Sequence, residues 1–147
     1  MSSPSSKSAL AALIATPPRV TDAGLLILRV GLGGFMAIGH GLGKLKANPA
    51  TFPDPIGIGS QLSYYGAVGS ELVGGLLLVI GLLTRLAAIP LLFTMLVAAL
   101  LVHRADPIFL GGGAAKEPAL IYALGYAAVL LLGPGRWSLD HVLFARR

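Results

Sequence analysis

Long apolar runs constrain this chain most, because few folds accommodate so many consecutive residues with so little charge. Four runs of about 16 to 23 residues lie at 23–45, 62–83, 86–102 and 117–132. About 20 apolar residues in a helix cross the ~30 Å hydrocarbon core of a bilayer, and a slightly shorter helix is accommodated by local thinning. The sequence therefore predicts an all-α integral membrane protein built as a four-transmembrane-helix bundle.

The composition agrees with that fold class. Of the 147 residues, 55% are hydrophobic and only 12% are charged, which is too little charge to cover a water-soluble surface. The net charge is +5, but the lysines and arginines stand at the ends of apolar runs, which indicates membrane flanking and argues against nucleic acid as a partner. The absence of cysteine excludes disulfides and thiol redox chemistry within the chain.

The segments outside the spans divide the chain into three parts. Residues 1–21 are expected to be a flexible or interfacial tail, 22–137 the transmembrane domain, and 138–147 an amphipathic basic tail with a short interfacial helix. An even number of spans puts both termini on one side. Basic residues expected on the side of the termini outnumber those expected on the other side, namely Lys7, Arg19, Arg85, Arg136, Arg146 and Arg147 against Lys44, Lys46, Arg104 and Lys116. This bias predicts an inner (plasma) membrane protein with cytoplasmic termini.

Three ionisable groups fall inside the predicted spans, where such groups are costly and therefore candidates for function. Arg29 and His40 are eleven residues apart, about three α-helical turns, so they should share one face of the first span. Glu71 enters from the second span, at about the level of Phe35. A buried carboxylate needs a cation, so Glu71 is expected to pair with Arg29, with His40 as second choice. Such a pair either fixes the register of two helices or positions a polar head group and relays protons.

Other polar and aromatic residues permit both plain and functional interpretations. Tyr122 and Tyr126 are four apart on the fourth span, where they either pack or flank a flat ring such as a quinone. Lys44 at the end of the first span is expected to reach the lipid head groups. His40 and His103 lack the paired spacing of a metal or haem site, so no metal is predicted. No nucleophile–base pair is visible, so no catalytic residue is named.

Three motifs, in this order, resemble the DoxX family of small four-helix membrane proteins. They are RVGLGGFMAIGHGLGKL (Arg29–Leu45), the pattern E-x-x-G-G-x-L-L-x-x-G-L-x-T-R (Glu71–Arg85) and GPGRWSLD (Gly133–Asp140). The family is similar to the membrane subunit of thiosulfate:quinone oxidoreductase, and some members are linked to complexes that handle thiols, superoxide or quinones. The positions that match its recurring polar residues are Arg29, His40, Lys44, Glu71 and Asp140.

The resemblance implies a membrane subunit of a quinone-linked oxidoreductase or redox-stress complex. Its polar groove would be formed by Arg29, His40, Glu71, Tyr122 and Tyr126, with a quinone as the implied ligand. An alternative is a non-catalytic accessory subunit, because the many glycines of the spans suit helix–helix docking with a partner subunit or a second copy. A small-molecule transporter or channel is a third alternative, although no inverted repeat is evident.

Overall fold

The computed structural model describes residue 15 and residues 17–145. Four helical rods make up most of this part of the chain. The first rod comprises α2 (Pro18–Phe35), η1 (Met36–Gly41) and α3 (Leu42–Lys44), and the second comprises α4 (Ser60–Val68), η3 (Gly69–Gly74) and α5 (Gly75–Ile80). The third comprises α6 (Thr84–Val97) and η4 (Ala98–Val102), and the fourth is α7 (Glu117–Leu132). A short 3₁₀ turn, η2 (Pro49–Thr51), and the six-residue α8 (Leu139–Phe144) complete the helices, and the described residues contain no β-strand.

The first rod begins earlier than the sequence predicts. Pro18 occupies the first helical position, where its missing N–H costs nothing and its fixed φ suits the helix. The helix therefore includes Arg19 and Val20, which the sequence assigned to the N-terminal tail. Most of that tail, together with the last two residues of the C-terminal tail, lies outside the described residues.

The outer surface of the bundle is apolar, as a bilayer requires. Rods of 27, 21 and 19 residues are long and apolar enough to span a membrane, and α7 adds a shorter apolar helix of 16 residues. Large side chains point outward, with Ile27 72%, Phe35 73% and Leu131 77% exposed. Such a surface is unsuited to water and suited to lipid. The predicted all-α membrane bundle is confirmed.

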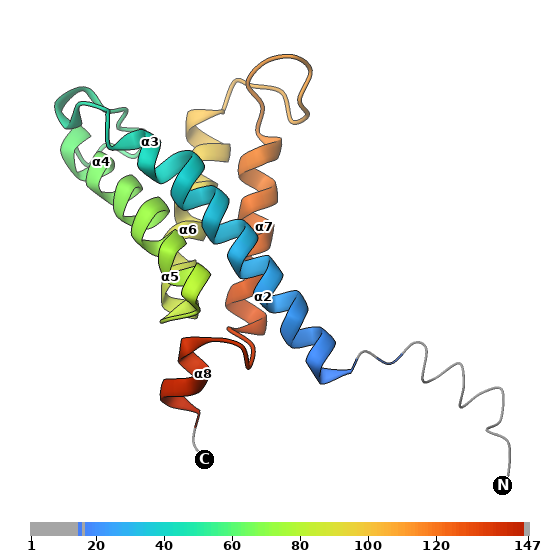
Figure 1. Ribbon diagram of the computed structural model, residues 1–147. Coiled ribbons are helices and arrows are strands. Elements are labelled where there is room, and N and C mark those ends of the chain that lie inside the picture. The colour runs from blue at the N-terminus through green and yellow to red at the C-terminus, as the bar shows by residue number, and fades with distance from the viewer. Residues whose placement is uncertain (1–14, 16, 146–147) are drawn as a thin grey trace, which may run out of the picture.

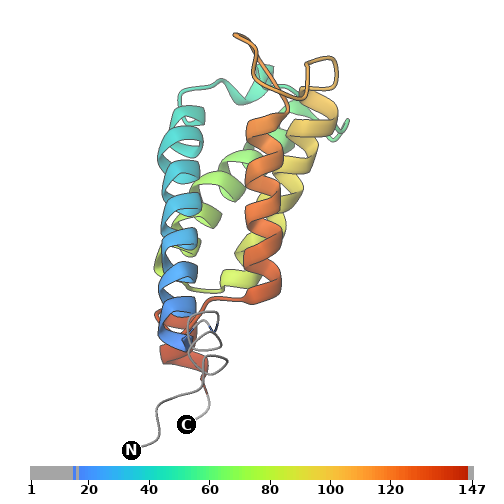
Figure 2. The same cartoon turned by 90° about the vertical axis from the view of Figure 1, so that its right-hand side faces the viewer.

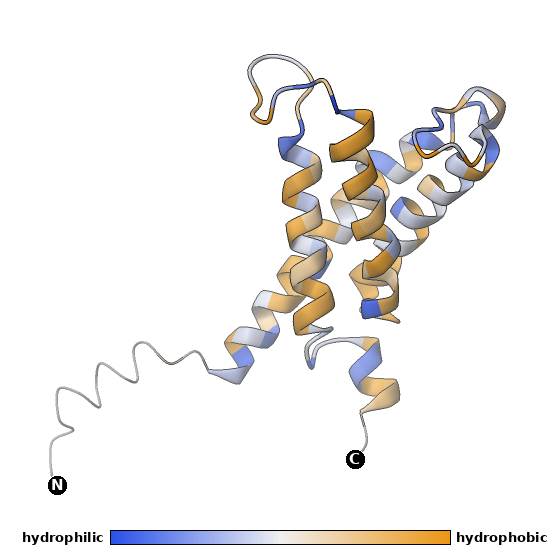
Figure 3. Ribbon diagram, turned by 180° about the vertical axis from the view of Figure 1, so that it is seen from behind, coloured by the Kyte–Doolittle hydropathy of each residue, from blue (hydrophilic) through white to orange (hydrophobic). Residues whose placement is uncertain are grey.

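The two ends of the bundle differ in what they carry (Figures 1 and 2). One end holds the segments 45–59 and 103–116, and we call it the loop end. The other holds the start of α2, the turn 81–83 and α8, and we call it the terminus end. Hydrophobic residues dominate the rods and hydrophilic residues gather toward both ends (Figure 3).

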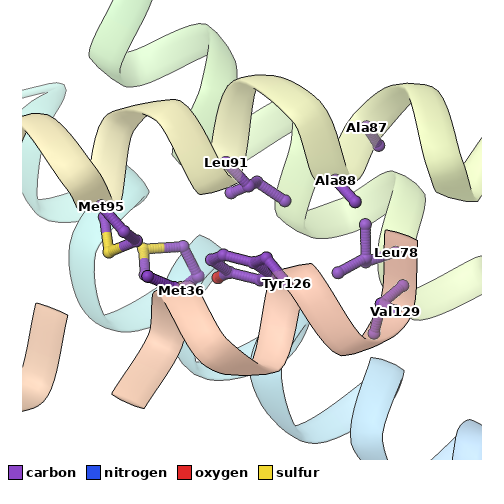
Figure 4. Packing of buried hydrophobic residues seen from close by; sticks show 9 residues of the cluster. Met36, Leu78, Ala87, Ala88, Leu91, Met95, Tyr126 and Val129 are labelled. Atoms are coloured by element: carbon purple, nitrogen blue, oxygen red, sulfur yellow. The ribbon is translucent and has the colours of Figure 1, made fainter. Parts of the chain in front are cut away.

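The core lies where all four rods approach one another. Tyr126 and Met36 are fully buried and lie side by side, and Leu78, Leu91 and Val129 extend the cluster toward the terminus end (Figure 4). Four small or flexible residues complete it, namely Ala87, Ala88, Met95 and Ala123. The core is therefore contributed by every rod, and α6 and α7 form its most extensive helix pair.

Glycines let the first two rods cross closely. A Cβ at Gly33 would lie 2.5 Å from the carbonyl oxygen of Gly75, and a Cβ at Gly41 would lie 2.7 Å from the backbone of Leu72. Only glycine permits that approach. Gly34 and several others on the same rod face open space, so not every glycine serves packing within the chain.

Three short π-helical segments interrupt the rods, and two of them face each other. η1 in the first rod packs against η3 in the second. A π turn holds more residues than an α turn, so it rotates every later side chain relative to α-helical register. His40 lies within η1 and Glu71 within η3, so both candidate residues occupy positions that simple α-helical counting misplaces.

Candidate functional site: a polar cleft at the loop end

A cleft of about 710 Å³ opens at the loop end between the rods. Its lining comes from all four rods and from both loops. Most of the wall is apolar, and the polar side chains that face it are His40, Lys44, Ser63, Ser70, Glu71, Thr94, His103 and Tyr122. Its volume and its mixture of apolar wall and few polar groups are typical of small-molecule sites.

An ion pair lies at the wall of this cleft. Lys44 Nζ of α3 donates to Glu71 Oε2 of η3 at 2.5 Å. The Glu71 side chain is only 4% exposed, whereas that of Lys44 is 28% exposed. The carboxylate is thus buried and paired, and both residues line the cleft. Lys44 keeps further donor hydrogens with which to meet a ligand.

The predicted Arg29–Glu71 pair is wrong. Arg29 Nη1 donates to the carbonyl oxygen of Leu78 at 3.0 Å, and Nη2 donates to that of Trp137 at 2.7 Å. Two causes explain the error. Glu71 lies nearer the loop end than counting from the shared loop predicts, because its neighbour Leu72 packs against Gly41, whereas the count places Glu71 level with Phe35. The π turns also rotate His40 and Glu71 away from the face that carries Arg29.

The sequence predicts no contact between Lys44 and Glu71. The place of Lys44 at the end of a span suggested contact with lipid head groups, and snorkelling is common for such lysines. Helical periodicity alone does not place Glu71 at the level of Lys44. The sequence signal for Lys44 is its place as the cation of the first span that lies nearest the loop, rather than toward the middle of the span.

Arg29 instead belongs to a polar cluster at the terminus end, which we call the latch and which also contains Asp140 and Asp22. The Asp140 carboxylate accepts from the backbone N–H groups of Leu83 at 2.7 Å and Thr84 at 2.8 Å, and so caps the start of α6. Asp22 Oδ1 accepts from the N–H of Arg136 at 2.8 Å. The latch fixes the GPGRWSLD segment across the base of the bundle.

The aromatic residues of the predicted groove separate into cleft and core. The His40 and Tyr122 rings meet edge to face with centroids 5.9 Å apart, and both residues line the cleft. Tyr122 and Tyr126 stack with centroids 5.9 Å apart and an interplanar angle of 27°. Because the two tyrosines contact each other directly, no flat ring lies between them. Tyr126 is fully buried and donates to the carbonyl oxygen of Leu32 at 3.4 Å.

The structure therefore brings together three of the five predicted groove residues. His40, Glu71 and Tyr122 line one cleft, while Arg29 lies in the latch and Tyr126 in the core. A second pair lies at the loop end, where Nδ1 of the cleft-lining His103 is 2.7 Å from Asp106 Oδ2. Within residues 15 and 17–145, no group of three or more His, Cys, Asp or Glu side chains is arranged to hold a metal ion.

Fold and cleft together define a class of protein, a small helical membrane protein with a largely apolar cleft between its rods that carries a few polar side chains. Comparison with known proteins is more specific: the DoxX family model matches residues 24–104, and the chain belongs to that family. It is 34% identical over 145 residues to a protein of Mycobacterium tuberculosis described as an uncharacterised membrane protein, Rv3486. That match covers 88% of this chain and 84% of the relative. No solved structure matches.

Proposed function

We propose that this protein is the membrane subunit of a quinone-linked oxidoreductase or redox-stress complex, and that the loop-end cleft holds the quinone head group. The observation that carries the proposal is the Lys44–Glu71 pair at the wall of an otherwise largely apolar cleft. A buried ion pair stabilises a fold weakly, because desolvation offsets most of its attraction. Its position beside a cleft is better explained by a role toward a ligand.

The residues present fit a quinone head. Quinone carbonyls accept hydrogen bonds, and Lys44, His40 and Tyr122 supply donors on one side of the cleft. The apolar wall suits the ring. Glu71 holds the Lys44 ammonium in place, so that its remaining N–H groups can donate to a quinone carbonyl. A bound quinone would supply the electron-accepting chemistry, with electrons delivered by a partner subunit.

Orientation follows the charge distribution. Lys44 is engaged by Glu71, so it contributes little to the basic residues facing the loop-end interface. The bias of Lys and Arg toward the terminus end, evident in the sequence, is thereby strengthened. We propose an inner-membrane location with the terminus end in the cytoplasm.

The test is photoaffinity labelling of the purified protein in nanodiscs with an azido-quinone, followed by peptide mapping. We expect label on peptides from η1, η3 and the first half of α7, and competition by unlabelled quinone. Lys44→Met should reduce labelling about tenfold, the equivalent of one charge-assisted hydrogen bond. Arg85→Met, at the opposite end, is the matched control and should label like the wild type. Uniform labelling that free quinone does not displace would refute the proposal.

A second candidate is a purely accessory subunit, and one observation favours it. Gly39 and Gly43 stand four residues apart on the first rod, and a Cβ at either would meet nothing within 4 Å. Paired small residues at this spacing are typical of helix–helix contacts in membranes. If Gly39→Leu disrupted co-purification of a partner subunit while Lys44→Met changed neither assembly nor activity of the complex, the accessory role would be preferred.

A further inference from the structure

We infer that the cleft opens sideways into the bilayer between α4 and α6, and that its ligand is an amphiphile with its polar head at Lys44 and an apolar tail in this opening. The inference rests on the proposed head-group site and adds the route of access and the class of ligand. It depends on three observations: the exposure of the two flanking helices, a wedge-shaped gap between them, and the position of the polar groups.

The two walls of the opening are apolar and exposed. Leu62 from α4 is 64% exposed and Phe93 from α6 is 56% exposed, yet both also line the cleft. A residue that lines a cleft and also faces outward marks a mouth. Because these helices stand in lipid, the mouth faces hydrocarbon and not water.

The gap between the helices narrows from the loop end toward the middle of the membrane. A Cβ at Gly66 of α4 would meet nothing within 4 Å, whereas a Cβ at Gly74 would lie 3.3 Å from Leu91 of α6. Eight residues, or about 12 Å of helix, separate the open position from the closed one. Figure 1 shows α4 diverging from α6 toward the loop end.

A polar contact marks the floor of the wedge. The Thr94 hydroxyl lies 3.0 Å from the Ser70 hydroxyl and 2.9 Å from the carbonyl oxygen of Pro90. The contact joins η3 to α6 between the open and the closed positions. Toward the loop end from this contact, the apolar residues that line the cleft include Leu62, Ala67 and Val97, and Phe93 lies level with the contact.

The polar and apolar halves of this space call for one kind of occupant. A water-soluble ligand would leave the apolar Leu62–Phe93 opening unused, and a plain hydrocarbon would offer no acceptor to the donor hydrogens that Lys44 keeps beyond its bond to Glu71. A polar head joined to a single chain satisfies both. Lipid access also spares the ligand any passage through water, which its tail would oppose.

Two glycines of α4 and η3 provide a matched pair of variants for the test. Gly66 lines the cleft and Gly69 does not, and a Cβ at either would meet nothing within 4 Å. Gly66→Leu should therefore fill the mouth, and Gly69→Leu should add the same side chain elsewhere on the same rod. Phe93→Ala provides an independent change, because it widens the mouth.

Binding is measured in nanodiscs with three probes: a ubiquinone analogue with a decyl tail, the same ring without the tail, and decanol. Concentrations are expressed per mole of lipid, so that partitioning of the tail into the bilayer cancels. For the wild type, we expect the tail to improve affinity for the quinone about tenfold through van der Waals packing in the cleft, because the bilayer reference leaves no hydrophobic gain. Gly66→Leu should abolish this gain, whereas Gly69→Leu and Phe93→Ala should keep it.

Each outcome bears on the inference. A gain from the tail that only Gly66→Leu removes supports it. Equal behaviour of Gly66→Leu and Gly69→Leu, or no gain from the tail, overturns it. If neither quinone binds but decanol binding is lost in Gly66→Leu, the lateral opening stands and the quinone function fails. If none of the three probes binds the wild type, both fail.

Discussion

Arg29 shows how a fully buried guanidinium is accommodated within a membrane span. Its donors meet the carbonyl oxygens of Leu78 and Val79, which end the second rod, and that of Trp137 in the last loop. Backbone carbonyls at a helix end lack partners within the helix, so a cation there satisfies them and complements the helix dipole. Arg29 is therefore a structural residue of the latch.

Replacing Arg29 should destabilise the protein markedly. Arg29→Met removes the donor of the Trp137 carbonyl and one of the two donors of the Leu78 carbonyl, which keeps the Gly81 N–H, at a cost of about 3 kcal/mol. We expect a lower midpoint of thermal unfolding in detergent, followed by the fluorescence of Trp137. Arg85→Met, which removes one exposed bond to the carbonyl of Leu131, is the control and should cost less than about 1 kcal/mol. Equal midpoints for the two variants would contradict the latch.

The Lys44–Glu71 pair should behave as a coupled unit. Lys44→Met leaves a carboxylate that is 4% exposed without its cation, and should cost about 3 kcal/mol of stability. Lys44→Met combined with Glu71→Leu removes both charges and should recover most of that loss. A double-mutant cycle by thermal unfolding gives the coupling. Additive effects of the two substitutions would show that the pair is not coupled.

Asp54 predicts a pH dependence at the loop end. The hydroxyl of Ser63 and then the N–H of Gly59 donate to its carboxylate and lower its pKa below the usual value. A carboxyl whose pKa is lowered on folding stabilises the fold above its unfolded pKa of about 3.9, and this contribution is lost as pH falls through the lower, folded pKa. Ser63→Ala should move the folded pKa upward, as measured by NMR of labelled aspartate. An Asp54 titration that Ser63→Ala leaves unmoved would contradict this contact.

At the residue level, the sequence identified the unusual ionisable side chains of the spans. It was less accurate about their partners. Arg29, His40 and Glu71 stood out because charge in a span is rare. Their partners depended on the relative height of two rods and on the π turns, and neither leaves a mark in apolar periodicity. Trp137 and Leu78 bind Arg29 through backbone carbonyls, which every residue possesses and no sequence pattern marks.

At the scale of elements, the crossing of the first two rods depends on individual glycines. The sequence indicated that the glycines of the spans suit helix–helix contacts, but it did not separate those in the crossing from those facing outward. Periodicity cannot do so, because glycine has no side chain to reveal which face is buried. The structure assigns Gly33 and Gly41 to the crossing and leaves Gly34 free of contact within 4 Å.

Neighbouring glycines offer a direct test of that crossing. Gly33→Ala places a methyl group 2.5 Å from the carbonyl oxygen of Gly75 and must push the first and second rods apart. We expect a loss of about 2 kcal/mol, in the range for overpacked cores. Gly34→Ala, one residue on, meets open space and should be neutral or slightly stabilising. Thermal unfolding of both variants in one detergent measures this difference. Similar midpoints would contradict the close crossing of the first two rods.

At the scale of the whole molecule, the fold class was the most predictable property. Run length and hydropathy alone fix the number and order of the rods. The fourth rod ends at Gly133, as the sequence predicted, whereas the second ends at Gly81 and not at Leu83, and both glycines have positive φ. The splaying of the rods at the loop end, which creates the cleft, is a tertiary property that no local pattern encodes.

The arrangement of the two ends can be tested directly, because the chain has no cysteine. Thr51→Cys places a single thiol at the loop end and Ala145→Cys at the terminus end, both at exposed positions. In spheroplasts, an impermeant maleimide should label Thr51→Cys at once and Ala145→Cys only after lysis. Labelling of both in intact spheroplasts would contradict a membrane between the two ends. The reverse pattern would invert the proposed orientation.

The latch has a consequence for how the protein is made. Arg29 and Trp137 are 108 residues apart, so the first span leaves the ribosome long before the carbonyl that Arg29 binds exists. Until then, this span carries an incompletely satisfied cation, which favours holding it at the insertion machinery or the interface. The Gly133–Asp140 motif, synthesised after all four rods, supplies the missing carbonyl and completes the latch. A chain that stops short of Trp137 would thus expose an orphan charge, a signal by which membrane quality control could recognise an unfinished product.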